Sequence, residues 1–173
     1  MGDFKLECLP RPSPGKRAQQ VGAKAEKVVT GMLAFCEKAG LGRVRKRASA
    51  TTIEHGTKRY LGTPGCDYSG HMTGGRAVYI EAKHSTVPRL PFDVFSDHQV
   101  KELTNASNDG AIAVVVVVLD VPRPAVFAVP WRVIVAAMNA RTRESFSLDE
   151  LKPWALGNVP LLASRAFCEE NKR

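Results

Sequence analysis

Apolar side chains recur every three or four positions between residues 18 and 39, and Gly40 follows the last of them. This spacing is typical of one side of a helix, and a glycine directly afterwards is typical of a helix C-cap. The pattern predicts one long amphipathic helix with a buried stripe formed by Val21, Ala25, Val28, Val29, Met32, Leu33 and Cys36.

Later segments have the composition of strands. Residues 66–71 and 76–83 are separated by Thr73-Gly74-Gly75, which predicts a hairpin. The β-branched residues near the end of 48–53 indicate a strand or hairpin arm. Residues 111–119 contain five consecutive valines and no polar alternation, which favours a strand covered on both faces.

Two short patterns mark the starts of further helices. Ser96 followed by Gln99 has the form of a capping box, and Ser147 with Glu150 has the same form. Residues 131–140 are also typical of a short helix. The order of helix, strands, helix, strand and helix predicts an α/β fold in which helices flank a mixed central sheet.

The length of 173 residues, 44% of them hydrophobic, suits one folded domain. Pro10, Pro12 and Pro14 lie close together in a stretch with few apolar side chains, so residues 1–15 are expected to form a mobile arm. The folded domain is expected to span residues 16–173.

The net charge of +8 is unevenly distributed. Residues 1–60 contain 13 Lys or Arg and 5 acidic side chains, whereas the remainder is neutral. A basic region of this kind favours a polyanion such as nucleic acid as the partner. A surface that only aids solubility, or one that meets a membrane, is the alternative.

The four cysteines form no CxxC pair, which argues against a zinc module. The N-terminus lacks the apolar run of a signal peptide, and the longest apolar stretch is too short to cross a bilayer as a helix. We therefore expect a cytoplasmic protein with free thiols and no membrane partner.

Candidate chemistry lies on the predicted hairpin. Glu81 and Lys83 are two residues apart on one strand and share a face, and a three-residue turn would place Asp67 directly opposite Glu81. Two facing carboxylates repel unless a cation lies between them, and oxygen ligands favour Mg²⁺, with Mn²⁺ as the alternative. The pattern is consistent with metal-assisted phosphodiester hydrolysis, and an ordinary Glu81–Lys83 salt bridge on a surface strand is the alternative.

Asp67 followed by Glu81-Ala82-Lys83 resembles the PD-(D/E)xK nuclease signature. The string from Gly62 to Gly70, together with Glu81-Ala82-Lys83 and His98-Gln99, resembles the RecU-type Holliday junction resolvases, also called penicillin-binding protein-related factor A. The resemblance extends from about residue 20 to 129. It implies a PD-(D/E)xK nuclease-like fold, a Mg²⁺-dependent endodeoxyribonuclease activity in DNA recombination and repair, and four-way DNA junctions as substrate.

The resemblance also implies further site residues. An acid on the first helix that follows a glycine by four positions joins the metal site in that family, which nominates Glu26 after Gly22 as a ligand beside Asp67 and Glu81. Gln99 corresponds to a glutamine that lies beside the lysine. From the residues alone, Glu26 is also consistent with a solvated helix acid, and Gln99 with a capping partner of Ser96.

In the resembled family, residues 42–62 correspond to a protruding arm that enters the junction, and cations flank it here. Grouped basic side chains suit backbone phosphates rather than base edges. We expect DNA contacts from Arg43, Arg45, Lys46, Arg47, Lys58, Arg59 and Arg76. Because resolution needs paired nicks in a symmetric substrate, a homodimer is expected. A PD-(D/E)xK nuclease for another duplex substrate and a non-catalytic architectural DNA-binding protein remain alternatives.

Overall fold

The computed structural model of the protein describes residues 14–48, 50–54, 57–62, 65–120 and 123–171. Most of the predicted N-terminal arm, residues 1–13, lies outside the described residues. The predicted long helix is confirmed as α1 (Pro14–Lys38), which begins earlier than the apolar spacing indicates because the apolar stripe starts only after its first turns. The chain then reverses at Gly40, whose φ of 70° is the left-handed conformation expected of a C-cap glycine.

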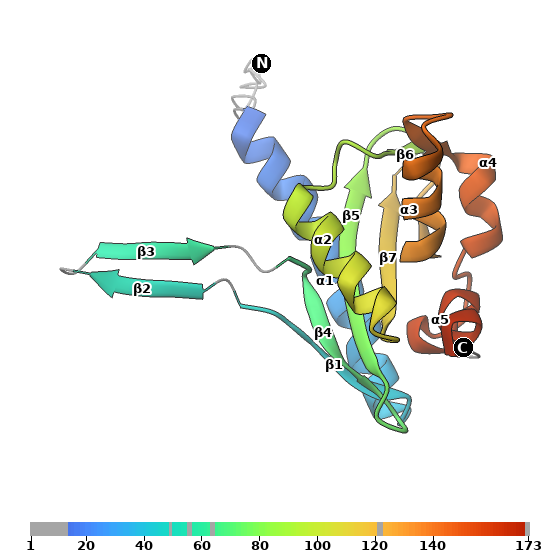
Figure 1. The fold of residues 1–173 in the computed structure, drawn as a ribbon, viewed down its shortest axis with the longest axis horizontal. Coiled ribbons are helices and arrows are strands. Elements are labelled where there is room, and N and C mark those ends of the chain that lie inside the picture. Colours follow the sequence, from blue (N-terminus) through green and yellow to red (C-terminus); the bar gives the residue numbers. More distant parts are fainter. Residues whose placement is uncertain (1–13, 49, 55–56, 63–64, 121–122, 172–173) are drawn as a thin grey trace, which may run out of the picture.

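The main sheet has five strands in the order β1-β4-β5-β7-β8 (Figure 1). They are β1 (Gly42–Lys46), β4 (Tyr68–Met72), β5 (Ala77–Ser85), β7 (Ile112–Leu119) and β8 (Ala125–Pro130). β5 and β7 pair in parallel, and every other neighbouring pair is antiparallel. The predicted mixed central sheet is therefore confirmed, and the valine-rich segment is its buried strand β7.

Helices cover both faces of this sheet, as predicted. Alternate residues of β7 enter two separate hydrophobic clusters. Val114 and Val116 pack with Val29 of α1, whereas Val115 and Val117 pack with Leu103 of the helix α2 (Asp97–Asn108). Each face of β7 is thus covered, which explains why its sequence shows no polar alternation.

The other elements are short or lie at the edges of the sheet. Ser96 caps α2 with the predicted capping box, and Ser147 caps α4 in the same way. The remaining elements are α3 (Trp131–Ala140), α4 (Leu148–Leu151), η1 (Lys152–Trp154), η2 (Leu161–Ala163), α5 (Arg165–Asn171) and the antiparallel pair β6 (Arg89–Pro91) and β9 (Ser145–Ser147). Among the described helices, none is both long and apolar enough to cross a bilayer.

A second antiparallel pair, β2 (Ala50–Glu54) and β3 (Thr57–Gly62), forms its own two-stranded sheet and projects far from the main body (Figure 1). β1, which precedes it, is instead an edge strand of the main sheet. Within residues 42–62, only the β2–β3 hairpin protrudes, whereas β1 belongs to the main sheet.

The β4–β5 hairpin has the predicted register. Tyr68 lies opposite Ile80, and His71 lies opposite Ala77. The turn between the strands uses Gly74 and Gly75 with φ of 97° and 89°, a conformation that favours glycine. β4 begins at Tyr68 rather than at residue 66, so Asp67 lies immediately before the strand, one step beyond the last pair.

Candidate active site

Glu81 and Lys83 lie in the middle of β5, which is bordered by β4 and β7. Ile80 packs in the cluster beneath α1, so the alternation of the strand directs Glu81 and Lys83 toward the opposite face. Glu81 is only 2% exposed, and the Lys83 ammonium lies 2.9 Å from its Oε1 atom. The Lys83 Nζ atom also lies 5.1 Å from the centre of the Phe95 ring. The pair is buried, so the alternative of an ordinary surface-strand salt bridge does not describe it.

Asp67 joins this pair from the neighbouring strand. Its Oδ2 atom accepts a hydrogen bond of 2.9 Å from the backbone N–H of Ala82, the residue between Glu81 and Lys83. The hairpin register therefore brings the two acids together, as the sequence predicted.

The electrostatics of the two acids indicate a place for a cation. Burial raises the pKa of Glu81 to about 7, the nearby Lys83 charge opposes this rise, and the Asp67 carboxylate adds to it. Burial also raises the pKa of Asp67, against the lowering effect of its hydrogen bond from Ala82. The Oε2 atom of Glu81 is buried and has no hydrogen-bond partner. A divalent ion beside these oxygens would satisfy the unpartnered atom and relieve the repulsion.

Gln99 connects the hairpin to α2, because it completes the predicted helix cap and also lies beside Lys83. Its backbone N–H donates to the Ser96 hydroxyl, and its Oε1 atom accepts from the Ser96 backbone N–H, which completes the capping box. The same Oε1 atom accepts a 3.0 Å hydrogen bond from Lys83, and its Nε2 atom donates to Glu81. The helix cap thus fixes the Gln99 side-chain amide, which in turn contacts Lys83 and Glu81.

Glu26 lies on α1, near Asp67 but engaged elsewhere. Its carboxylate pairs at 2.5 Å with Lys46 of β1, and its backbone carbonyl accepts a 2.8 Å hydrogen bond from the Tyr68 hydroxyl. Its charge contributes to the raised pKa of Asp67, so it lies within electrostatic reach of the site. In the described part of the chain, no group of three His, Cys, Asp or Glu side chains has the geometry of a metal site. In this structure Asp67 is bonded to β5, whereas the Glu26 carboxylate pairs with Lys46, so the role of Glu26 as a metal ligand stays a prediction.

The oxygen donors of Asp67 and Glu81 fit Mg²⁺ or Mn²⁺ better than zinc, because hard divalent ions prefer carboxylate ligands and retain several waters. Two carboxylates are a sufficient protein contribution for such an ion. The unpartnered Glu81 Oε2 atom is the observation in this structure that supports the fit.

The predicted DNA-contacting cations fall into three groups. Arg43 and Arg45 of β1 are well exposed and pair with Glu37 of α1, and Lys46 pairs with Glu26. Exposed pairs of this kind are weak, so a DNA phosphate can compete for these side chains. Lys58 and Arg59 belong to β3 of the projecting hairpin, and their side chains lie outside the described part of the structure.

Arg47 and Arg76 are bound within the protein. The Arg47 guanidinium pairs with Glu102 of α2. Arg76 donates from Nε to the Gly110 carbonyl at 2.9 Å and from Nη1 to the Glu170 carbonyl. Glu102 was not predicted as a site residue. In the sequence it is one charged residue in the helix after the Ser96–Gln99 cap, and no motif marks its pairing with Arg47.

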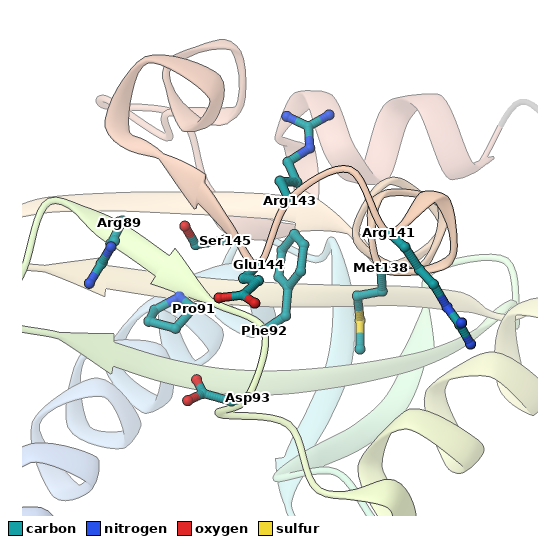
Figure 2. Close-up of a pocket in the computed structure, with 9 residues that line it drawn as sticks. All are labelled: Arg89, Pro91, Phe92, Asp93, Met138, Arg141, Arg143, Glu144 and Ser145. Carbon is teal, nitrogen blue, oxygen red and sulfur yellow. The ribbon is translucent and has the colours of Figure 1, made fainter.

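A groove of about 710 Å³ lies elsewhere, between β6, β9 and the end of α3, and contains neither Asp67 nor Glu81 (Figure 2). Three arginines line it, but Arg143 points away from the groove and pairs with Glu150. Asp93 and Glu144 add negative charge. The side chains do not converge, so the carboxylate cluster on β5 is the better candidate for chemistry.

A mixed sheet has helices on both faces here, with an Asp just before one strand of a hairpin and a Glu and a Lys on the other, which is the arrangement of the PD-(D/E)xK class. The sequence model of the family described as RecU, Recombination protein U, matches residues 43–158. The chain belongs to this family.

Among solved structures, the chain is similar to Hjc of Archaeoglobus fulgidus, described as a Holliday junction resolvase from an archaeal hyperthermophile. The two chains are 25% identical, with a TM-score of 0.48, and the match covers 78% of this chain and 93% of that one. A search of curated proteins found no match.

Proposed function

We propose that this protein is a divalent-metal-dependent DNA endonuclease that resolves four-way (Holliday) junctions. The observation that carries this proposal is the cluster of Asp67 and Lys83 around the buried Glu81, on a hairpin of a Recombination protein U family member. Glu81 is buried and Asp67 is partly buried, and both have raised pKa values. Apolar side chains would stabilise the fold better at these positions, so the two acids point to a functional role.

Asp67 and Glu81 would hold Mg²⁺ or Mn²⁺. When bound, the ion polarises a phosphodiester oxygen and makes a bound water more acidic. Asp67 is already oriented by the Ala82 N–H, and Glu81 by Gln99. The two ligands therefore need little rearrangement, which lowers the entropic cost of binding.

Lys83 would stabilise the negative charge that develops on the phosphate as the attacking water forms its new P–O bond and the bond to the leaving oxygen breaks. Its ammonium donates to Gln99 and Glu81, which fixes the long side chain in one position. Gln99 acts here as a positioning residue, since its amide touches both groups and its own backbone is set by the helix cap.

The exposed cations of β1 and the projecting β2–β3 hairpin would bind the DNA backbone. Arg43 and Arg45 are more than half exposed on the strand that leads into the hairpin. Phosphate contacts of this kind carry no base information, so the shape of the junction would determine selectivity. Two symmetric nicks require two active sites, so a homodimer is part of the proposal. Cys36, Cys66 and Cys168 are free thiols, which fits action in a reducing cytoplasm.

Two other functions account for part of these features. A PD-(D/E)xK nuclease for ordinary duplex DNA would use the same catalytic cluster, and an architectural DNA-binding protein would use only the cations. The paired acids argue against the second, because a pure binder gains nothing from buried carboxylates near phosphates.

The test is cleavage of a mobile four-way junction and of a matched linear duplex, with Mg²⁺ and with Mn²⁺. The wild type is compared with Asp67→Asn and with Asp149→Asn, whose side chain is 84% exposed and remote from the cluster. We expect the wild type and Asp149→Asn to cut the junction in preference to the duplex, and Asp67→Asn to cut neither. Equal cutting of both substrates would support the duplex nuclease, and salt-sensitive binding without cutting would support the architectural protein.

A further inference from the structure

Arg47 lies at the point where the chain leaves β1 and turns toward the projecting hairpin. Its backbone N–H donates a 2.8 Å hydrogen bond to the carbonyl oxygen of Asp67. The base of the hairpin is thereby bonded directly to the residue that carries a catalytic carboxylate.

The side chain of Arg47 extends this connection to α2. Its Nη1 atom donates to the Glu102 carboxylate and lies 3.4 Å from the Cys66 sulfur. Glu102 follows Gln99 by three positions, which places the two side chains on neighbouring turns of the same helix face.

The segment ahead of Asp67 is closely packed against this ion pair. A Cβ atom at Gly65 would lie 2.8 Å from the Cβ atom of Glu102, which cannot move away as a side-chain end can, so glycine allows the backbone to approach α2 this closely. The Oε2 atom of Glu102 is itself buried, and the Glu102 side chain is 22% exposed. Arg47 and Glu102 thus enclose Gly65 and Cys66, the two residues that lead into Asp67.

We propose that the Arg47–Glu102 pair is a clamp that positions Asp67 for metal binding, and that Arg47 is therefore a positioning residue and not a DNA phosphate contact. The metal-binding role of Asp67 rests on the proposed function, whereas the clamp itself does not. Arg47 follows β1 directly and precedes the hairpin in the chain, so the clamp lies between the hairpin and the active site. A displacement of the hairpin by DNA would be transmitted to Asp67 through the same bonds.

The first experiment measures the clamp without any metal. The Ala82 amide donates to the Asp67 carboxylate, so its hydrogen exchange reports how firmly Asp67 is held. Exchange is measured by NMR in EDTA, relative to the Val116 amide in the buried strand β7, which reports global opening. We expect Ala82 exchange to accelerate at least about tenfold relative to Val116 in Arg47→Ala and in Glu102→Ala. The double variant should be no faster than either single one, because both substitutions remove one interaction.

Two further variants keep this test specific. Lys101→Ala changes the exposed neighbour of Glu102 and should leave Ala82 exchange at the wild-type rate. Arg47→Met keeps a long apolar stem but removes the charged donor to Glu102, so it should accelerate exchange as Arg47→Ala does.

The second experiment titrates each protein with Mn²⁺ alone. Loss of a group that orients a metal ligand typically weakens binding by about 10–100-fold, and we expect that loss in Arg47→Ala and Glu102→Ala but not in Lys101→Ala. Wild-type protein that binds no Mn²⁺ would contradict the proposed function. The Ala82 exchange rates would still show whether Arg47 and Glu102 hold Asp67 in place. Unchanged Ala82 exchange in both Arg47→Ala and Glu102→Ala would overturn the clamp. Tighter junction binding by Glu102→Ala would show that Glu102 merely shields a DNA-binding arginine.

Discussion

Asp67 accepts a 2.9 Å hydrogen bond from the backbone N–H of Ala82, on the strand that carries Glu81 and Lys83. The bond holds the partly buried Asp67 carboxylate beside the buried Glu81, although burial raises the pKa of both and the Asp67 charge raises that of Glu81 further. The metal-free site is therefore an electrostatically unfavourable arrangement that the hairpin imposes.

Asp67→Asn should relieve this repulsion while an amide oxygen still accepts from Ala82. In EDTA at pH 8, we expect the free energy of unfolding to rise by about 0.5–2 kcal/mol, as is common when a functional site is neutralised. Addition of Mg²⁺ should stabilise the wild type by mass action but leave Asp67→Asn unchanged. Urea unfolding with and without Mg²⁺ measures both effects. A variant less stable than the wild type in EDTA would show that the repulsion is unimportant.

Stability should also depend on pH through Glu81. In the unfolded chain this carboxyl has a pKa near 4.5, and in the folded protein the pKa is about 7, so the protonated form favours folding. The contribution is complete below pH 4.5 and is lost as the pH rises through 7. In EDTA we expect the free energy of unfolding to fall between pH 5 and pH 8, and Glu81→Gln to flatten that slope.

Mn²⁺ affinity should change with pH in the opposite direction, because the ion binds the carboxylate form. Calorimetric titration at pH 6, 7 and 8 should show progressively tighter binding by the wild type. The groups with lowered pKa values, such as Glu37 and Asp120, titrate below this range and do not contribute to the slope. A pH-independent Mn²⁺ affinity would argue that Glu81 is not a ligand.

Lys83→Met should separate chemistry from metal binding. Loss of one group that stabilises transition-state charge typically costs about 10²–10³-fold in rate. We expect single-turnover junction cleavage to fall by that factor, while Mn²⁺ still binds and the pKa of Glu81 rises because its neighbouring cation is gone. Lys101→Met is the control and should cleave normally. Undiminished cleavage by Lys83→Met would remove lysine from the proposed mechanism.

Arg76→Ala and Arg43→Ala should have different effects, although the sequence nominated both arginines as DNA contacts. Arg76 bonds two backbone carbonyls, those of Gly110 and Glu170, so its loss should destabilise the fold by about 1–3 kcal/mol. Arg43 is 67% exposed, so its loss should leave stability nearly unchanged and should weaken junction binding. Thermal unfolding and binding across a salt series distinguish the two, since each lost phosphate contact lowers the salt slope by about one.

The hairpin register could be predicted from the sequence because the turn and both strands are local. Glycines at 74 and 75 fix where the chain reverses, and that fixes Asp67 beside Glu81. The same holds for the Ser96–Gln99 cap, whose partners are three residues apart. Short sequence separation leaves few alternative pairings, so the pattern alone identifies the contacts.

The roles of the arginines could not be predicted, because their partners are distant in sequence. Arg47 meets Glu102 across 55 residues, and Arg76 meets the Glu170 carbonyl across 94. Both bonds depend on how α2 and α5 pack on the sheet. A surplus of positive charge in the first 60 residues indicates an anionic partner, but it does not identify which cations the protein uses internally.

The apolar sequence of β7 makes the unfolded chain prone to aggregate before the sheet has formed. Ile112–Leu119 contains no charged residue, no proline and five valines in succession, which is the composition of segments that stack into intermolecular cross-β structure. In the native sheet β5 and β8 occupy both of its edges. Its parallel partner β5 is separated from it by α2, so this edge closes late in folding. We expect refolding yield to fall steeply with protein concentration, and light scattering during dilution from denaturant to measure the loss.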